Sequence, residues 1–581
     1  MINKLLNYYF LKEIYSILKI FTPSIMVSNN TILKTKEEYI EEINSLQLTY
    51  FGNIINIIKP EIKRVILFGT MKLLIGVHFN FCKIFKDTIL YNILDNVNAV
   101  YWLQVIIFFV SFKAIKLFNS LFVKYGPNKA IDIFLFISAG FYLIFTIFIF
   151  INSYFFNTGT IKAIINSNVL LIRGLGFIEN ILIILVNFIM VIYYLMVDIL
   201  SNLFINIVFF MYMNYNTTPN QFPRYFKIVG LFNGISHLIT SYIVNNMIII
   251  QSKYFCVSNE KYLYIMIYFC NTVLIMVIYG LKYLLDNEIT TNILYKNENE
   301  DKGILKTKSK TSINFKNIVI LLTKSNILYS LVLFSTMCNF VSSGFSLIDK
   351  YVYKAYALYC SMEPSANPLG NNIPNVTNIS MYFKSFEMIN LFFGTIFLMI
   401  SPFMNAAWKL FGFLGYGILM ILLYAFVTLT SSYWAIYNYP FTNFGKPVIF
   451  NLHFKNLTPN FWMEAIFISV NNFIVKMTKY TFMDAAIEVA LSRINPFQRG
   501  IYKTIASGIV PNTVKLLLSF YGIISNEWFR IKDMRYLLVL STIIAFIIIL
   551  FTIKPIFFLS KEIKKAEKTD TYINDSNIYL K

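Results

Sequence analysis

Long apolar runs recur along the whole chain and alternate with shorter polar segments. A helix needs about 20 mostly apolar residues to cross the hydrocarbon layer of a membrane. On this criterion the pattern predicts about twelve membrane-spanning helices. The predicted spans are residues 65–82, 99–118, 131–151, 176–213, 226–250, 262–285, 318–347, 381–404, 410–435, 461–490, 501–524 and 536–559.

A polar, lysine-rich segment separates the first six runs from the last six. We therefore expect an all-α polytopic membrane protein built from two six-helix halves, similar in architecture to major-facilitator carriers. The expected parts are a cytosolic N-terminal segment, an N-terminal half, a charged cytosolic linker, a C-terminal half and a cytosolic tail. They correspond to residues 1–64, 65–285, 286–316, 317–559 and 560–581.

The distribution of basic residues predicts the orientation in the membrane. Lysine and arginine gather before the first run, in the central linker and in the tail. Loops rich in these residues stay in the cytoplasm. All three segments fall on the same side if each half has an even number of spans, so both termini are expected to be cytosolic.

Composition agrees with this class and excludes others. Of 581 residues, 57% are hydrophobic and 14% charged, whereas soluble domains have about 45–50% and about 25%. The net charge of +21 is spread between apolar runs rather than gathered on one polar domain, so no nucleic-acid partner is expected. Five cysteines without a CxxC pair and three histidines predict neither a metal nor a cofactor.

Charged residues inside or beside the predicted spans are the candidate functional residues, because a charge in the hydrocarbon layer is costly and normally faces a partner or a water-filled cavity. The plainer interpretation is that these side chains reach from a helix end to the membrane interface. The candidate substrate-binding residues are Lys83, Lys86, Asp87, Asp198, Asp349, Lys354, Lys479, Asp484 and Glu488.

Four short motifs resemble one transporter family, the ATP/ADP-antiporter-type nucleotide transporters of plastids, intracellular bacteria and microsporidian parasites. Residues 83–88, KIFKDT, are similar to the family pattern R-D-x-K-D-T, and an acid stands in the fourth span within MVDIL. Residues 346–354, SLIDKYVYK, resemble N-L-V-E-x-x-W-K, and residues 479–490, KYTFMDAAIEVA, resemble K-Y-S-L-F-D-x-x-K-E-M-A. The chain departs from these patterns at Ile84 and at Ile487, where the family has an acid and a lysine.

The resemblance implies a function. The chain would exchange or import ATP against ADP, with other purine nucleotides as further substrates, by alternating access of a central cavity. Lysines would hold the phosphates, and the acids would pair with the lysines when the site is empty. The resemblance implies no catalytic residues and no enzyme activity. It also implies a monomer in the plasma membrane of an intracellular parasite, with a mitosome or another organelle membrane as the alternative.

Two other function classes are compatible with a polytopic chain. One is a carrier of the same fold for a nucleoside, a sugar or a proton-coupled anion. The other is a membrane enzyme or a channel, which would need a catalytic cluster or a ring of like residues along a pore. The sequence contains no Walker A loop, HExxH or GxSxG motif, and such motifs accompany the corresponding hydrolases. Charges at matching positions of two halves favour a carrier.

Overall fold

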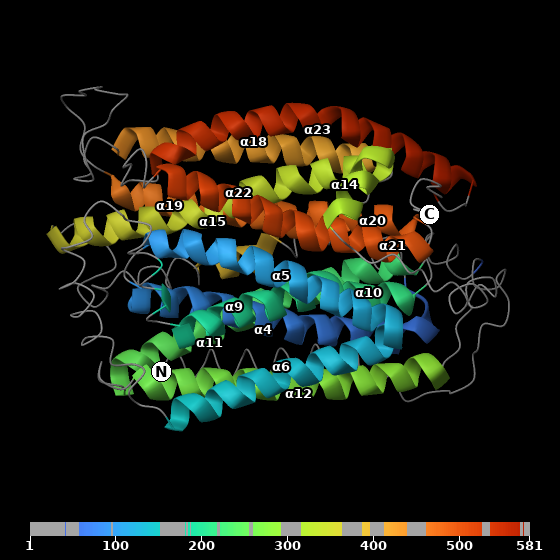
Figure 1. Ribbon diagram of the computed structural model, residues 1–581, viewed down its shortest axis with the longest axis horizontal. Helices are drawn as coiled ribbons and strands as arrows, with labels where there is room; N and C mark the ends of the chain where they lie inside the picture. The colour runs from blue at the N-terminus through green and yellow to red at the C-terminus, as the bar shows by residue number, and fades with distance from the viewer. Residues whose placement is uncertain are drawn as a thin grey trace.

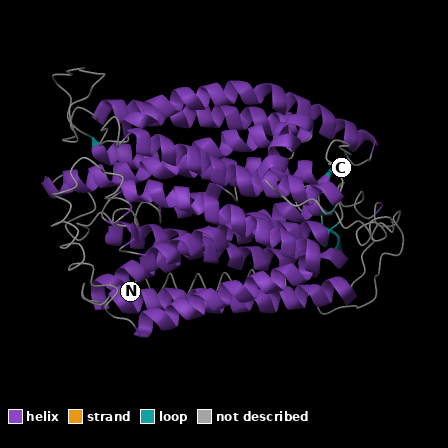
Figure 2. Ribbon diagram, viewed as in Figure 1, coloured by secondary structure: helices purple, strands orange, loops and turns teal. Residues whose placement is uncertain are grey.

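The computed structural model describes most of the predicted spans. The described ranges are 57–94, 97–151, 188–217, 221–254, 260–291, 315–362, 386–394, 412–438, 460–494, 496–525 and 535–569, with 41, 181, 184–185 and 573 as isolated positions. Within these ranges every element is a helix except one isolated bridge between Ile494 and Ile573 (Figure 2). The expectation of an all-α polytopic membrane protein is confirmed.

The N-terminal half packs around α4. This helix contacts α9, α11 and α12, while α6 packs on α12 and α5. The elements are the 3₁₀ turn η1 (Lys59–Glu61), α4 (Ile62–Leu94), α5 (Val97–Tyr125), α6 (Pro127–Ile151), α9 (Phe188–Leu203), the π-helical η3 (Phe204–Val208), α10 (Phe209–Tyr215), α11 (Phe222–Tyr254) and α12 (Glu260–Thr291).

The C-terminal half packs around α15 in the same manner. This helix contacts α19, α22 and α23, and α18 packs on α19 and α23. The elements are α14 (Phe315–Lys324), α15 (Asn326–Met362), α18 (Phe413–Asn438), α19 (Phe461–Met477), the π-helical η7 (Thr478–Met483), α20 (Asp484–Ser492), α21 (Pro496–Lys503), the π-helical η8 (Thr504–Ile509), α22 (Val510–Ile523) and α23 (Arg535–Thr569). Figure 1 shows this half above the N-terminal half, with the helices of both running across the view.

Eight helices among the described residues are long and apolar enough to cross a membrane. Two of them extend well beyond the predicted spans. The span predicted at 65–82 lies within α4, which continues to Leu94, and α15 continues to Met362. Proline and glycine are the strongest helix terminators, and neither occurs in residues 83–94. Lys83 and Lys86 therefore lie inside a helix, not at its end.

The run predicted as one span at 318–347 is divided between two helices. Ser325 separates α14 from α15, and its hydroxyl accepts a hydrogen bond of 3.0 Å from the backbone N–H of Leu328. A serine in this position satisfies one of the free N–H groups of the first helical turn. The break coincides with four consecutive polar residues, 323–326, within the apolar run. The prediction of a single span passed over this short polar stretch.

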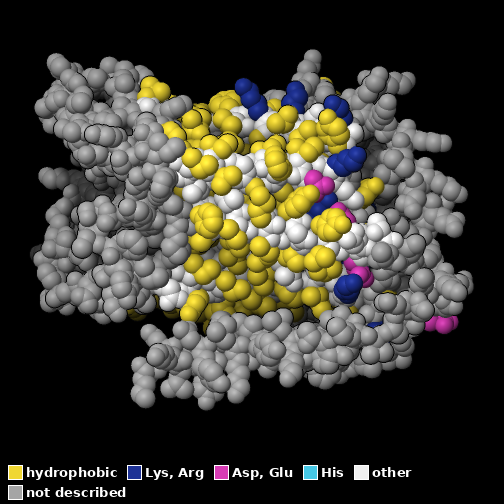
Figure 3. Space-filling model, turned by 90° about the horizontal axis from the view of Figure 1, so that it is seen from below, with side chains coloured by type: hydrophobic (Ala, Val, Ile, Leu, Met, Phe, Trp, Pro, Cys, Tyr) yellow, Lys and Arg dark blue, Asp and Glu magenta, His cyan; other side chains and the backbone are white. Residues whose placement is uncertain are grey.

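The outermost helices carry the apolar surface expected to face lipid. On α6, Phe136 and Ile144 are 79% and 66% exposed, and on α23 Leu550 and Phe551 are 67% and 70% exposed. Figure 3, seen from the side of the N-terminal half, shows apolar side chains over the middle of the visible described surface and charged ones toward its edges. Such a broad apolar surface would be unstable in water.

Ion pairs fasten the helices of the N-terminal half at one end. The guanidinium of Arg224 donates two hydrogen bonds of 2.8 and 2.9 Å to Glu61. Lys282 lies 2.7 Å from Asp132 and 2.6 Å from Asp286. These contacts join η1, α6, α11 and α12, so we expect this half to move as one body.

The two halves meet along α5 and α22, which pack against each other. A Cβ atom added at Gly522 would lie 2.7 Å from the ring of Tyr101, and one added at Gly508 would lie 2.8 Å from Ile207 and 3.4 Å from Ile115. Tyr101 precedes Ile115 on α5, whereas its partner Gly522 follows Gly508 in the chain, so α5 and α22 are antiparallel. Glycine lets helices approach closely, and here it does so at two places along the contact between the halves.

Candidate functional site

A cavity of about 90 Å³ lies between the two halves. The helices α4, α5, α9 and η3 line it on the N-terminal side, and α15, α19, η7, η8 and α22 line it on the C-terminal side. Pockets that hold drug-sized ligands measure about 300–1,000 Å³. The cavity as described has room for a few water molecules, and a larger ligand requires the halves to separate.

Four lysines line this cavity, and none of its described lining residues is acidic. Lys83 comes from the N-terminal half, whereas Lys476, Lys479 and Lys515 come from the C-terminal half. Four ammonium groups around a small space attract anions strongly, because the protein interior screens charge less than water does. The chemistry of the lining therefore favours an anionic ligand.

Lys479 is placed by a π-helical segment. It lies in η7, between α19 and α20, and its ammonium donates a hydrogen bond of 3.1 Å to the side-chain oxygen of Asn339 on α15. The amide of Asn339 in turn donates 2.8 Å to the carbonyl of Ser335. The π-helical segments η3 and η8 also border the cavity, through Ile207 and Ser507. Such segments are rare and occur frequently at functional sites.

Lys476 has a buried counter-ion. Its side chain is 12% exposed and forms an ion pair with the carboxylate of Glu387, which is completely buried. Glu387 belongs to the helical segment 386–394, where the ring of Phe473 lies so close to Gly394 that a Cβ there would be 2.6 Å away. The segment that carries Glu387 is therefore packed closely against α19, the helix that carries Lys476.

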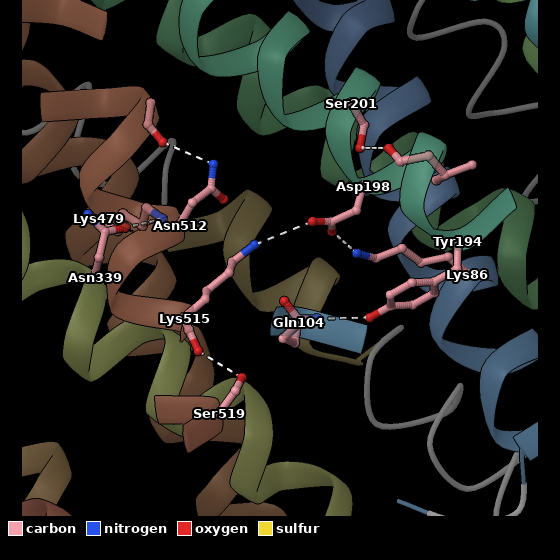
Figure 4. A network of polar contacts seen from close by, with 12 residues as sticks. Lys86, Gln104, Tyr194, Asp198, Ser201, Asn339, Lys479, Asn512, Lys515 and Ser519 are labelled. Atoms are coloured by element: carbon pink, nitrogen blue, oxygen red, sulfur yellow. Dashed lines mark hydrogen bonds and ion pairs between the residues drawn. The ribbon is translucent and has the colours of Figure 1, made fainter. Parts of the chain in front are cut away.

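Asp198 connects two lysines from different halves. It forms a buried ion pair with Lys86 of α4, and its other carboxylate oxygen lies 3.7 Å from the ammonium of Lys515 on α22. Figure 4 shows Asp198 between these two side chains. The ammonium of Lys86 also lies 4.8 Å from the ring centroid of Tyr194, whose hydroxyl accepts a 3.1 Å hydrogen bond from Gln104. Lys86 is thus held beside the cavity but is not part of its lining.

Asp484 and Glu488 of α20 mark a second contact between the halves. Glu488 forms an ion pair with Lys503 and accepts a hydrogen bond of 3.1 Å from Asn214 of α10. Asp484 lies close enough to interact electrostatically with Lys479, Lys503 and Lys72. The ring of Phe210 lies 4.5 Å from the ammonium of Lys72 and 4.5 Å from that of Lys503. These groups join α4 and α10 to α20 and α21.

The structure places the sequence-predicted residues in three groups. Lys83 and Lys479 line the cavity, Lys86 and Asp198 pair beside it, and Asp484 and Glu488 lie on α20 away from its lining. The other three residues lie on described helices, but their side chains are outside the described part of the chain. These are Asp87, Asp349 and Lys354.

Ile487, which stands where the resembled family has a lysine, is buried in the apolar core and is 1% exposed. The position therefore contributes no charge to the cavity. The lysines from neighbouring turns and helices, Lys476, Lys479 and Lys515, supply the positive charge on this side.

Three charged residues at or beside the cavity were not among the predicted ones. Lys515 lies with Lys503 in the apolar run 501–524, and Glu387 is the one acid of the run 381–404. An ionisable residue inside a predicted span is by itself a signal of function, so both could have been identified. Lys476 lies three residues before the motif at 479–490, so the resemblance did not select it.

Comparisons with known proteins identify relatives, one of which matches nearly the whole chain. No family model matches the chain. It is 23% identical over 546 residues to ADP,ATP carrier protein 1 of Encephalitozoon cuniculi, covering 92% of each chain. It is also 30% identical over 129 residues to ADP,ATP carrier protein 3 of that organism, covering 22% of this chain and 24% of the relative.

Solved structures of other transporters are similar at a lower level. A bacterial homologue of the iron transporter ferroportin, in an outward-facing state, aligns with a TM-score of 0.47 at 12% identity, covering 85% of this chain and 99% of its own. The fucose:proton symporter of E. coli aligns with a TM-score of 0.46 at 11% identity, covering 84% and 98%.

The relatives identified by sequence are named as carriers, which agrees with the expectation that the chain is a transport protein and not an enzyme. Similarity to the first of them extends over nearly the whole of both chains. The resemblance predicted from four short motifs is thereby confirmed: this membrane protein is a relative of the ADP,ATP carrier proteins.

Proposed function

We propose that this protein is a membrane nucleotide carrier that exchanges ATP for ADP by alternating access. The observation that carries the proposal is the lysine-lined cavity between the halves, with Lys83 on one side and Lys476, Lys479 and Lys515 on the other. Lysine binds phosphate as a point charge. Several lysines converging on one space suit a chain of phosphates better than they suit a nucleoside or a sugar, which carry no charge.

The acids beside the cavity give a reason for exchange. When no substrate is present, Asp198 neutralises Lys86 and Lys515, and Glu387 neutralises Lys476. Phosphate oxygens would compete with these carboxylates for the same ammonium groups. Release of the substrate then costs less free energy, because each lysine pairs again with its carboxylate. Binding has to be similar in the two facing states, since a carrier that strongly preferred one state would stall.

The contacts between the halves support alternating access. The contact of Gly508 with Ile207 precedes Lys515 in the chain, on η8, and the contact of Gly522 with Tyr101 follows it, on α22. If the halves separated at one of these contacts and stayed closed at the other, the cavity would open to one side of the membrane. We propose that the halves rock in this way, and that the described form, whose cavity is small, is a closed one.

Uptake measurements test the proposal. Cells that express the protein are expected to accumulate radiolabelled ATP, and unlabelled ATP and ADP should compete while adenosine and glucose should not. Lys86→Ala should abolish uptake, whereas Lys124→Ala, at an exposed position beyond the predicted span on α5, should leave it unchanged. Competition by adenosine or glucose but not by ADP would establish a carrier of another solute instead.

We further propose that the protein acts in the plasma membrane of an intracellular parasite, as a monomer with both termini in the cytosol. The basic tail, with Lys561, Lys564 and Lys565 on the last turns of α23, supports this orientation. One chain supplies both walls of the cavity, so a second copy is not required. Antibody labelling of tagged termini before and after permeabilisation of the cells tests the orientation, and signal from intact cells would contradict it.

A further inference from the structure

The two walls of the cavity differ in chemistry. The N-terminal half contributes five apolar side chains, together with Lys83 and Ser111. The five are Phe79, Ile115, Ile199, Leu203 and Ile207. The C-terminal half contributes Lys476, Lys479, Lys515, Asn339, Asn512 and three serines, and its remaining lining residues are Pro511 and Gly508. One wall is thus largely apolar and the other largely polar and cationic.

A nucleotide has the same two-part character. Its phosphates need cationic or hydrogen-bonding partners, because burying a charge without them is very costly. Its base has flat apolar faces that gain free energy by stacking on an aromatic ring, and such stacking tolerates any base. Phe79 is the aromatic side chain among the described lining residues. It lies one helical turn before Lys83, whose ammonium is 6.0 Å from the centroid of the Phe79 ring.

We propose that the two halves bind different parts of the nucleotide. The base packs against Phe79 and the apolar wall of the N-terminal half, and the phosphates bind the lysines of the C-terminal half. Lys83 lies at the boundary and faces the phosphate nearest the base. This inference rests on the proposed function and adds an orientation to it. A ligand that carries both parts touches both halves, and can therefore draw them together in a way that base or phosphate alone cannot.

A comparison of ATP binding with inorganic tripolyphosphate binding distinguishes the roles of the two walls. The purified full-length protein is titrated with each ligand in competition with labelled ATP. For Phe79→Leu we expect the affinity for ATP to fall about tenfold, in keeping with the loss of one base–aromatic contact, while the affinity for tripolyphosphate stays within twofold. Phe79→Trp should retain ATP binding. Lys479→Gln should lower the affinity for both ligands by the same factor.

The unchanged affinity of Phe79→Leu for tripolyphosphate is also the control for folding. An equal loss of affinity for both ligands in this variant, or no loss for either, would overturn the proposed orientation of the nucleotide while leaving the proposed function intact. A wild-type protein that binds tripolyphosphate but gains nothing from the base would overturn it as well. A wild-type protein that binds neither ligand would overturn both proposals.

Discussion

The ammonium of Lys515 on α22 lies 3.7 Å from the carboxylate of Asp198 on α9, so a single acid links the two halves while it also neutralises Lys86. Asp198 is 3% exposed, and the side chain of Lys515 is 30% exposed and lines the cavity. The acid is therefore fixed within one half, while the lysine of the other half is the partner that can turn to a substrate.

The first prediction concerns Lys515. Lys515→Gln removes a positive charge from the lining without leaving Asp198 alone, because Lys86 still pairs with it. Hydrogen bonds to charged groups are worth about 1.5–3 kcal/mol, so we expect the apparent affinity for ATP to fall tenfold or more in exchange measurements. Lys124→Gln on α5, which is exposed and lies beyond the predicted span, is the matched control. An unchanged affinity would show that Lys515 does not contact the substrate.

The second prediction concerns Asp198. Asp198→Asn leaves Lys86 as a charge with 6% exposure and no carboxylate partner at this position. Removing one member of a buried ion pair costs about 3–5 kcal/mol. We expect a lower unfolding temperature and loss of exchange, and the double variant Asp198→Asn with Lys86→Met should recover the unfolding temperature but not exchange. Full exchange in the single variant would contradict the role of this pair.

The third prediction concerns Glu387, which under the proposed function would act on the substrate through Lys476. Glu387→Gln removes the carboxylate that competes with phosphate for this lysine. We expect KM for ATP to fall and the maximal exchange rate to fall with it, because tighter binding slows release. If the Lys476–Glu387 pair were purely structural, the variant would instead show lower protein abundance with KM unchanged. That result would show that Glu387 has no role in substrate binding.

The fourth prediction concerns the contact between the halves. Gly522→Leu places a side chain where even a Cβ would lie 2.7 Å from Tyr101, so the halves cannot close there. We expect ATP to bind and exchange to fall more than tenfold. The control is Gly280→Leu on α12, since a Cβ at Gly280 meets nothing within 4 Å. Equal exchange by both variants would show that closure at Gly522 is not part of the cycle.

Hydrophobic periodicity predicted the class and the approximate spans, because a bilayer imposes a minimum length on each apolar run. It could not predict where helices continue through charged residues, as α4 does through Lys83 and Lys86. Helix continuation depends on the absence of terminators and on ion pairs with distant residues such as Asp198. These partners are 112 residues apart along the chain, which no local pattern reveals.

The candidate site was predicted in part, and the reason is similar. Motif resemblance led to Lys83 and Lys479, which line the cavity. It did not lead to Lys515 or Glu387, which lie outside the four motifs and whose ion-pair partners are on other helices. It also grouped Glu488 with the cavity, whereas Glu488 pairs with Lys503 and Asn214 at a separate contact between the halves.

Exchange in reconstituted vesicles tests the central claim most directly. The purified protein is placed in liposomes that contain either unlabelled ADP or buffer, and entry of radiolabelled ATP is followed over time. The account predicts rapid entry into the ADP-loaded vesicles, little entry into the empty ones, and no entry in either case for Lys479→Gln. Equal entry with and without internal ADP, or entry unaffected by the loss of Lys479, would contradict it.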